Sequence, residues 1–484
     1  MLRAAALCAA IGAAAAILSF RPIYEPDLWW HLAHGRENLS GHIVRTNLFS
    51  FNYGDYRQRY TSWLFDTGLF AAWRIAGPVG IQAGQALLLT AALLILFAAC
   101  RVRAPAWSAA AVLALGFFIL EPRAIPRPHL VSFAGLATCT WLSERARAQR
   151  TAAPLWWTVP LIAVWSNFHV ECVFGVLLLA LFSTAELIRP SWLTRRDAWQ
   201  ALGITTLAGL ATMLNPYGWG LGAYLYENLS VPRIVAIAEL QPPRLPAYRA
   251  FFAYLVLTAG LLFSQPRRLT LSEGAAAILF GTLGWMHLRE TPLVLLATAP
   301  MVATRLAAIT THGIDYRAIL VTMFAGALAL SRIPVPLLFT EFQAGRGAVE
   351  PTQFFSPQAL QFIQQKGLDG PVFNSHNLGG YLAWSLYPRV RIFQDSRLQA
   401  YPPWHFRRII EASASQEAWN ALVAGVDWAV ISVSRPNQLA GTGRFPAADW
   451  VSVYQDDAME IVVRRKGKFS GVLSSGATVN ETMR

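Results

Sequence analysis

Residues 25–36 read Glu-Pro-Asp-Leu-Trp-Trp-His-Leu-Ala-His-Gly-Arg, and they follow closely on the first apolar segment of the chain, residues 3–20. Two carboxylates, two histidines and an arginine therefore gather where the chain leaves a hydrophobic run. Acidic side chains in such a place are costly unless they are solvated, paired or bound to an ion. The stretch thus indicates a polar site beside a membrane-spanning segment.

The composition is that of a membrane protein. Of the 484 residues, 55% are hydrophobic and only 14% are charged, with a mean hydropathy of +0.38, whereas soluble domains carry roughly 25% charged residues. The net charge of +13 comes mainly from basic residues in short loops between apolar runs, which argues against nucleic acid as a partner. The four cysteines lie in or beside apolar segments and show no spacing typical of a metal site or a disulfide framework.

Apolar runs long enough to cross a bilayer, about 17–25 residues with their flanks, predict an α-helical polytopic membrane bundle of about eleven transmembrane helices. They lie near residues 3–20, 79–100, 105–120, 129–143, 155–167, 172–188, 199–214, 249–264, 273–288, 291–304 and 317–339. The first run ends in Ser-Phe-Arg-Pro without a small-residue cleavage site, so we expect an uncleaved helix rather than a signal peptide. The shorter apolar segment 63–75 is expected to lie in the membrane interface.

The distribution of arginines predicts the orientation of the bundle. Thirteen arginines fall before the first span or in alternate short loops, which places the N-terminus and these loops in the cytoplasm. We interpret these arginines as topology signals. The opposite side then carries the first loop, residues 21–78, and everything after about residue 340. Its arginines have acids nearby and look like parts of a site; the pairs are Glu121 with Arg123, Glu239 with Arg244 and Glu290 with Arg289.

The composition changes near residue 345, where an extracytoplasmic domain is expected. Helix-like patterns alternate there with short β-like runs, which predicts a small α/β domain over residues 345–466. The predicted helices and strands cover 356–365, 415–423, 371–373, 390–393, 428–433 and 460–463. The transmembrane domain is expected over residues 1–340, and the Ser-, Gly- and Thr-rich residues 467–484 are expected to form a disordered tail.

The acids of the opening stretch, Glu25 and Asp27, flank a proline, which resists a helix interior and sets the pair on an extended or turning backbone. A carboxylate there can act as a general base toward a hydroxyl group or hold a divalent cation. Arg36 nearby can bind a phosphate. Trp29 and Trp30 suit the aromatic belt of a membrane interface or a platform on which a sugar stacks. The structural alternative is a helix start with Asp27 as its N-cap.

A second outer loop, residues 121–129, holds a compact cluster of donors in Arg123, Arg127 and His129. Such a cluster suits a phosphate or pyrophosphate. The alternative is a solvated turn that contacts lipid headgroups.

Two tight crossings between apolar runs add further candidates. His169 and Glu171 lie near membrane depth and need partners, although a structural His–Glu pair fits them as well as a catalytic one. Arg289, in the crossing His287-Leu-Arg-Glu290, is another candidate for anion binding.

The order of these features resembles the GT-C superfamily of integral membrane glycosyltransferases: one helix, an acidic motif in the first outer loop, many further spans and an outer C-terminal domain. Glu25-Pro-Asp27 matches the place and the spaced-acid form of the superfamily's motif. Further motifs resemble a group of bacterial multi-span proteins of this type: Asp27–His31, Gly35-Arg36, Thr46–Ser50, Asn167–His169, Asn215–Gly218, Gln241–Pro243, Asn377–Leu382 and Phe393–Arg397. The chain departs from that group at Glu171, where glycines usually follow the histidine, and at Gln394, where an apolar residue is usual.

The resemblance implies a glycosyltransferase that moves a sugar from a polyprenyl-phosphate-linked donor to a glycan, lipid or protein acceptor on the extracytoplasmic side. Asp27 would be the catalytic base with Glu25 in support, and both would hold a divalent cation, Mg or Mn, if the chemistry is metal-dependent. The expected ligands of substrate and lipid phosphate are His31, Arg36, Arg123, Arg127, His129, His169, Glu171 and Arg289. Residues 377–397 fit a substrate contact or a purely structural role.

The same resemblance places the protein in the bacterial inner membrane, in glycan biosynthesis of the cell envelope. Two other functions stay open. A non-enzymatic scaffold or transporter of lipid-linked glycans should carry charged residues on several spans at midplane depth, whereas here they concentrate at the outer ends. An enzyme like an O-antigen polymerase or ligase typically relies on a large outer loop between later spans, whereas this chain carries its acidic motif in the first loop.

Overall fold

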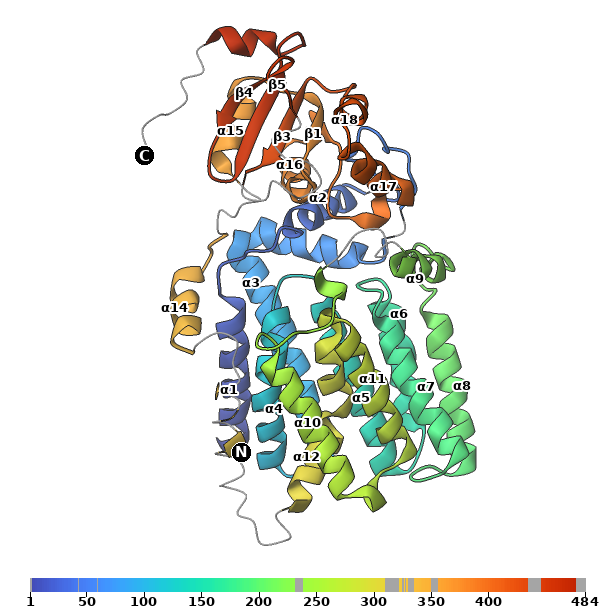
Figure 1. Ribbon diagram of the computed structural model, residues 1–484. Coiled ribbons are helices and arrows are strands. Elements are labelled where there is room, and N and C mark those ends of the chain that lie inside the picture. Colours follow the sequence, from blue (N-terminus) through green and yellow to red (C-terminus); the bar gives the residue numbers. More distant parts are fainter. Residues whose placement is uncertain are drawn as a thin grey trace. The chain divides into compact units, whose positions relative to one another are not determined.

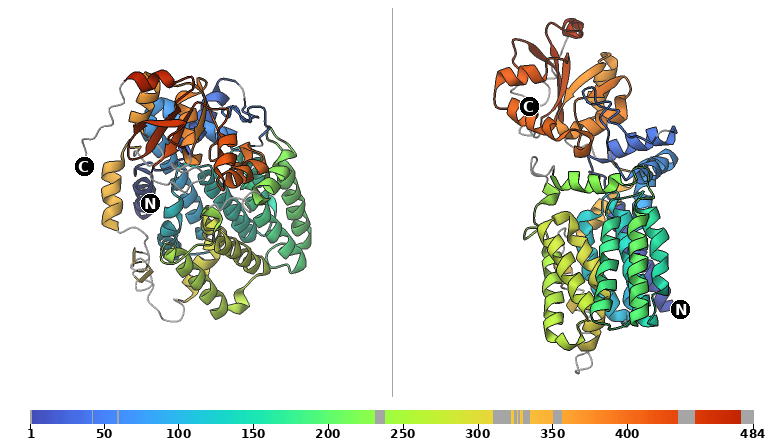
Figure 2. Two further views of the ribbon diagram at one scale, coloured as in Figure 1. Left: turned by 45° about the horizontal axis from the view of Figure 1, so that its top comes forward. Right: turned by 90° about the vertical axis from the view of Figure 1, so that its right-hand side faces the viewer.

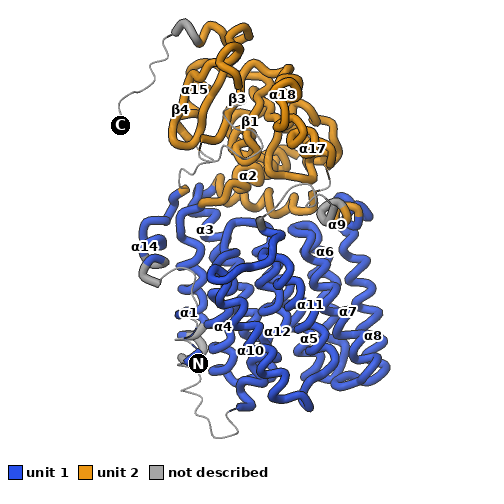
Figure 3. Tube along the Cα trace, viewed as in Figure 1, with its two compact units in different colours: residues 1–23, 75–222, 236–348 blue, residues 24–74, 223–235, 349–484 orange. Residues whose placement is uncertain are grey.

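The computed structural model describes residues 2–41, 43–58, 60–230, 238–309, 322–323, 326, 328–329, 335–349, 356–433 and 445–475. The chain divides into two compact units (Figure 3). Unit 1 comprises Met1–Ile23, Ile75–Gly222 and Ala236–Ala348, and unit 2 comprises Tyr24–Arg74, Ala223–Val235 and Val349–Arg484. The first outer loop, which the sequence analysis assigned to the transmembrane domain, thus groups with the C-terminal residues.

Long apolar helices form unit 1 and lie side by side (Figures 1 and 2). They are α1 (Leu2–Ser19), the later part of α3 (Trp63–Arg101), α4 (Ala106–Leu120), α5 (His129–Gln149), α6 (Thr158–Trp165), α7 (Cys172–Ile188), α8 (Arg195–Ala211), α10 (Arg249–Ser264), α11 (Leu271–Met286) and α12 (Thr291–Ile309). Helices therefore occupy the first ten predicted spans. The eleventh predicted span, 317–339, falls largely outside the described residues. Its last residues belong to the described helix α14 (Val335–Gly345).

Length and composition single out three helical stretches in the described part of the chain that are able to cross a membrane: Trp63–Arg101, Ala106–Arg123 and Leu288–Ile309. Several other apolar helices are shorter, so the number of eleven spans stays a prediction. The longest stretch is broken at Ala76 and Gly77, where Gly77 has a φ of +57° that favours glycine. The segment 63–75 is therefore a helix distinct from the apolar span that follows the break.

Small residues let the helices of unit 1 approach closely. The indole of Trp165 lies against Gly135 of α5 and Gly175 of α7, and a Cβ atom at either glycine would come within 2.7 Å of the ring. The Trp165 Nε1–H group donates to the Ser132 hydroxyl at 3.0 Å. Close backbone approach and interhelical hydrogen bonds are what hold helices together where lipid removes the hydrophobic driving force.

A buried ionic network joins the loop-side ends of several helices in unit 1. Arg103 contacts both Glu144 and Glu273, with Nη2 at 3.0 Å and 2.9 Å from their Oε1 atoms. Arg147 donates to Glu144 at 2.5 Å, and Arg305 lies 3.5 Å from Glu273. The sequence analysis interpreted these three arginines only as topology signals. They are also the partners of two buried carboxylates, a role visible only once the helices are packed.

Unit 2 is built on a five-stranded sheet in the order β2-β1-β3-β5-β4 (Figure 1). The strands are β1 (Gly370–Asn374), β2 (Val390–Ile392), β3 (Trp428–Ser432), β4 (Trp450–Gln455) and β5 (Met459–Arg464). β1 pairs in parallel with β2 and β3, whereas β5 pairs antiparallel with β3 and β4. Four strands coincide with the predicted β-like runs, and β4 was not predicted.

Helices of unit 2 flank the sheet, and the first outer loop extends it. The helices are α2 (Leu28–Leu39), the early part of α3, α15 (Pro357–Gln365), α16 (Gly379–Leu386), α17 (Pro403–Ala412) and α18 (Gln416–Leu422). Ser50 forms a parallel bridge with Ile392, so the loop adds to the free edge of β2. Within the predicted tail, Ser470–Ser475 form a 3-10 helix, and 476–484 lie outside the described residues.

The ionic network in unit 1 generates a stability prediction. Replacing Glu273→Ala removes a partner of both Arg103 and Arg305 and leaves buried charge uncompensated, which costs about 3–5 kcal/mol. Glu341→Ala is the control, because Glu341 is 25% exposed and lies 3.6 Å from Arg21; such a pair is worth about 1 kcal/mol or less. Unfolding in detergent measures both. A loss no larger for Glu273→Ala than for Glu341→Ala would contradict the role of the network.

Candidate functional site

Asp27 stands directly before α2, in the place of an N-cap residue, but its side chain makes no capping hydrogen bond. Instead, the hydroxyl of Ser396 donates to Asp27 Oδ1. The carboxylate is only half-buried. The structural alternative of a capping aspartate is therefore not the arrangement found, and Asp27 presents a carboxylate oriented by a residue of the C-terminal sequence motif.

Glu25 supports the position of Asp27 from the other side. Its side chain is buried, and Oε1 accepts the backbone N–H of Asp27 at 3.0 Å. Across the described residues, no group of three or more His, Cys, Asp and Glu side chains is placed to hold a metal ion. A cation at this acidic pair would therefore keep water ligands or bind a substrate phosphate as well, as Mg²⁺ commonly does. Metal dependence stays a prediction.

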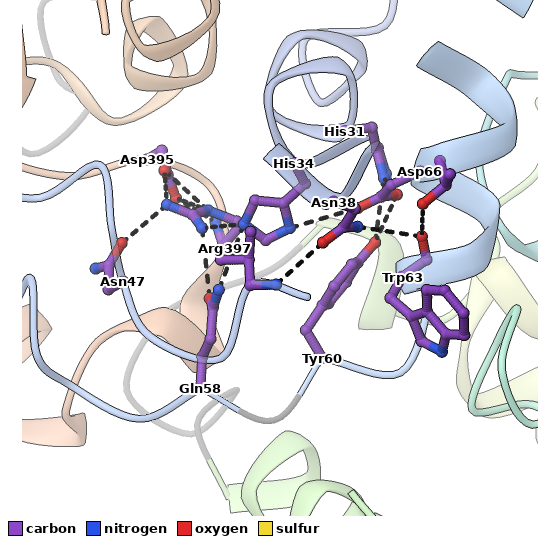
Figure 4. A network of polar contacts seen from close by, with 12 residues as sticks. His31, His34, Asn38, Asn47, Gln58, Tyr60, Trp63, Asp66, Asp395 and Arg397 are labelled. Carbon is purple, nitrogen blue, oxygen red and sulfur yellow. Dashed lines mark hydrogen bonds and ion pairs between the residues drawn. The ribbon is translucent and has the colours of Figure 1, made fainter. Parts of the chain in front are cut away.

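Arg397, one residue after Ser396, is the centre of a buried polar network within unit 2 (Figure 4). Its guanidinium pairs with both oxygens of Asp395, at 2.6–3.0 Å. It also donates to His34 Nε2 at 2.6 Å and to Asn47 Oδ1 at 2.9 Å. All four side chains are at most 3% exposed. Because a guanidinium can only donate, His34 Nε2 must carry no proton, and the neutral ring keeps its proton on Nδ1.

The network continues from His34 through Asp66 to the predicted ligand His31. His34 Nδ1 lies 3.4 Å from Asp66 Oδ2, and His31 Nδ1 lies 2.6 Å from Asp66 Oδ1. Tyr60 donates to the same carboxylate at 3.2 Å. Burial raises the pKa of Asp66 to about 6, against the opposing effect of His31. His31 thus has partners inside the protein, and its contact with substrate stays a prediction.

Arg36 of α2 and Gly380 of α16 bring these two helices into contact. Arg36 Nη1 donates to the Trp384 carbonyl at 2.9 Å, and the guanidinium lies 5.1 Å from the Trp384 ring centroid. A Cβ atom at Gly380 would come within 3.3 Å of the Trp30 backbone. The motif at 377–382 therefore has a clear packing role. That Arg36 binds phosphate stays a prediction.

In unit 1, the two arginines of the loop 121–129 meet on Glu239, an acid that the sequence analysis noted only beside Arg244. Arg123 and Arg127 both donate to Glu239 Oε1, at 3.0 Å and 2.8 Å. His129 lies beside them, with Nε2 2.7 Å from the Arg123 carbonyl and Nδ1 3.4 Å from Arg123 Nη2. Burial opposes ionisation of Glu239, but Arg127 and then Arg123 hold its pKa well below the usual value. The two arginines thus share one carboxylate oxygen of the protein itself, and phosphate binding by Arg123, Arg127 and His129 stays a prediction.

The candidates from the two tight crossings also lie in unit 1. His169 Nδ1 is 2.8 Å from the Ser132 hydroxyl and 3.3 Å from Glu171 Oε2. Arg289 donates to Glu290 at 2.8 Å, and it interacts electrostatically with Glu171. Every candidate in unit 1 therefore has an acid or a hydroxyl nearby, and which of them touch substrate stays a prediction.

Sequence reasoning missed Ser396, His34, Asp66 and Glu239. Ser396 lies in the quoted motif Phe393–Arg397, so the signal was present but pointed to no particular partner. Asp66 could have been noticed as a lone acid in the apolar segment 63–75. Glu239 was noted only beside Arg244, because its partners Arg123 and Arg127 are more than 100 residues away along the chain.

The network in unit 2 generates a prediction of pH dependence. Burial and then Arg397 lower the pKa of His34 well below 6.5, so the folded protein keeps the ring neutral while the unfolded chain takes up a proton below that pH. Stability is therefore retained above pH 6.5 and falls as pH drops, by up to about 1.4 kcal/mol per pH unit from this group. His34→Gln keeps an acceptor for Arg397 and a donor for Asp66 but cannot titrate.

The measurement is thermal unfolding in detergent from pH 7.5 to 5. The parent protein should lose stability more steeply than His34→Gln below pH 6.5, with the two curves parallel above it. Identical slopes in the two proteins would rule out His34 as the titrating group.

Comparison with known proteins establishes the fold. No protein-family model and no curated protein sequence matches the chain. The solved structures that are similar over most of its length include AglB and ArnT. The archaeal oligosaccharyltransferase AglB from Archaeoglobus fulgidus, in complex with an inhibitory peptide and a dolichol-phosphate, has a TM-score of 0.61 and 13% identity, covering 89% of this chain and 70% of that chain.

ArnT from Cupriavidus metallidurans bound to undecaprenyl phosphate has a TM-score of 0.54 and 15% identity, covering 95% of this chain and 97% of that chain. Its apo structure has a TM-score of 0.56. Both neighbours are membrane glycosyltransferases of the GT-C superfamily. The resemblance expected from the first-loop acids is therefore confirmed at the level of the fold, and this chain has the fold of the GT-C membrane glycosyltransferases.

Proposed function

We propose that this protein is a glycosyltransferase that moves a sugar from a polyprenyl-phosphate-linked donor to an acceptor on the extracytoplasmic side of the bacterial inner membrane. The observation that supports this proposal is the position of the Asp27 carboxylate. It is a half-buried carboxylate at the start of α2, supported by Glu25 and oriented by Ser396, on a fold shared with AglB and ArnT. The structures of these neighbours hold dolichol-phosphate and undecaprenyl phosphate.

Asp27 would accept the proton of the acceptor hydroxyl group while the oxygen of that hydroxyl group attacks the anomeric carbon of the donor sugar. General base catalysis of this kind contributes roughly 10²–10⁴-fold to a rate. The hydroxyl of Ser396 keeps one oxygen of the Asp27 carboxylate in place. Ser396 and Glu25 would act as positioning residues, because each contacts Asp27.

The phosphate leaving group requires cations, since negative charge develops on its oxygen as the sugar–phosphate bond breaks. Arg123 and Arg127 are suited to this role because their guanidinium groups converge on a single anionic oxygen. His129 and Arg289 would assist.

A scaffold or transporter of lipid-linked glycans is the second candidate, but no observation favours it. Its acids and arginines would line a path through the bundle. Instead, the charges of unit 1 fall in compact, mutually paired clusters beside Arg123 and beside Arg103.

Asp27→Asn tests the proposal. The amide keeps the size of the side chain but cannot accept a proton, so transfer from a polyprenyl-phosphate-linked sugar should fall by at least about 100-fold. The assay follows radiolabelled sugar leaving a panel of such donors in membranes that contain the overexpressed protein.

Asp55→Asn is the matched control, because Asp55 is an exposed acid of the same first loop. Its activity should stay within about twofold of the parent. Undiminished transfer by a folded Asp27→Asn protein would refute the assignment of the base, and the lack of transfer from every donor by the parent protein would favour the non-enzymatic candidate.

A further inference from the structure

Glu239 occupies the arginine pair to which the proposed function assigns the donor phosphate. One carboxylate oxygen accepts from both Arg123 and Arg127, at 3.0 Å and 2.8 Å. Their side chains are 7% and 19% exposed, against 29% for Glu239. The cations are therefore more buried than the anion, so they form the built part of the site and the carboxylate lies on its open side.

The backbone beside Glu239 is held independently of these ion pairs. Glu239 belongs to the 3-10 helix η4 (Ala238–Leu240). The Leu240 carbonyl lies 2.8 Å from His287 Nδ1, and the Gln241 carbonyl accepts the Leu288 N–H at 2.8 Å. The segment is thus anchored at the crossing 287–290, and the side chain of Glu239 can leave the arginines without releasing it.

The charges of the pair match an exchange between carboxylate and phosphate. Two guanidiniums and one carboxylate leave a net charge of +1. A phosphodiester, the form of a polyprenyl-phosphate-linked sugar, carries one negative charge like Glu239. The phosphate monoester left after transfer carries about −1.5 to −2 at pH 7, so it neutralises both arginines and would be held more tightly than the donor.

We propose that Glu239 is an internal placeholder for phosphate: its carboxylate pairs with Arg123 and Arg127 when no lipid phosphate is bound, gives way to the donor, and returns to compete the monoester product off. The inference rests on the proposed function, since it takes the lipid phosphate as the ligand of this pair. It assigns to Glu239 control over affinity and product release rather than a part in the chemistry.

The competing reading is that Glu239 builds the site by holding the two arginines in place. The two hypotheses predict opposite changes in phosphate affinity when the charge of Glu239 is removed. A placeholder weakens phosphate binding, so removing its charge tightens binding. A structural acid preorganises the arginines, so removing it loosens binding.

The test measures binding of farnesyl phosphate, a short polyprenyl monophosphate, to the full-length protein in detergent by calorimetry. Glu239→Gln and Glu239→Ala should each lower the Kd about tenfold. Glu341→Gln is the control, because it removes an acid of similar exposure, 25%, from its ion pair with Arg21 of unit 1; its Kd should stay within twofold of the parent. Unchanged or weaker binding by both Glu239 variants, with parental melting temperatures, would overturn the placeholder.

Two further ligands separate the phosphate from the lipid chain. Inorganic phosphate should bind more tightly to the Glu239 variants, whereas farnesol should bind all four proteins alike. Tighter binding of farnesol to the variants would overturn the inference, because it would mean that the substitutions open a lipid path rather than free two cations.

Sugar transfer distinguishes this inference from the proposed function. If transfer depends on Asp27 but the Glu239 variants bind farnesyl phosphate no better than the parent, only the placeholder fails. If the variants bind it tenfold better but no donor supports transfer, the placeholder stands as an anion switch and the proposed function fails. When both hold, added farnesyl phosphate should inhibit Glu239→Gln at about tenfold lower concentration than the parent.

Discussion

The candidate catalytic region depends on the hydrogen bonds and the ion pair that the buried guanidinium of Arg397 makes. A charge out of water is tolerated only when its hydrogen-bonding capacity is met, and here Asp395, His34 and Asn47 meet it. Two of these partners come from the first outer loop, and one comes from the C-terminal sheet region. The same contacts that satisfy the charge therefore join segments more than 300 residues apart into unit 2.

That junction explains how Asp27 is oriented. Ser396 lies between Asp395 and Arg397, so its backbone is held by the ion pair on either side, and its hydroxyl meets Asp27. The Asn377–Leu382 motif contributes through glycines, since Gly380 lets α16 approach α2 closely. The carboxylate owes its placement to packing and polar contacts made elsewhere in the unit, as preorganised sites generally do.

The buried charges of unit 1 also need partners, but they are paired in two different ways. Arg103, Arg147 and Arg305 share two buried glutamates, so each charge of this network has an opposite charge beside it within the bundle. Arg123 and Arg127 instead share the partly exposed Glu239. A carboxylate at the open side of two more buried cations can be exchanged for another anion, whereas a fully enclosed one cannot. Burial therefore separates a structural network from a candidate binding site when residue types alone do not.

The sequence by itself determined the class of the protein, the positions of ten helices of unit 1, four of the five described strands and the nearness of Glu25 and Asp27. Hydrophobic run length, β-like alternation and a carboxylate beside a proline are local signals, readable within a window of a few residues. Only the tertiary structure decided which polar groups meet: Ser396 with Asp27, Arg397 with His34, and Glu239 with Arg123 and Arg127. These pairs join residues separated by more than 100 positions, and their energies depend on burial and geometry, which a local pattern does not encode.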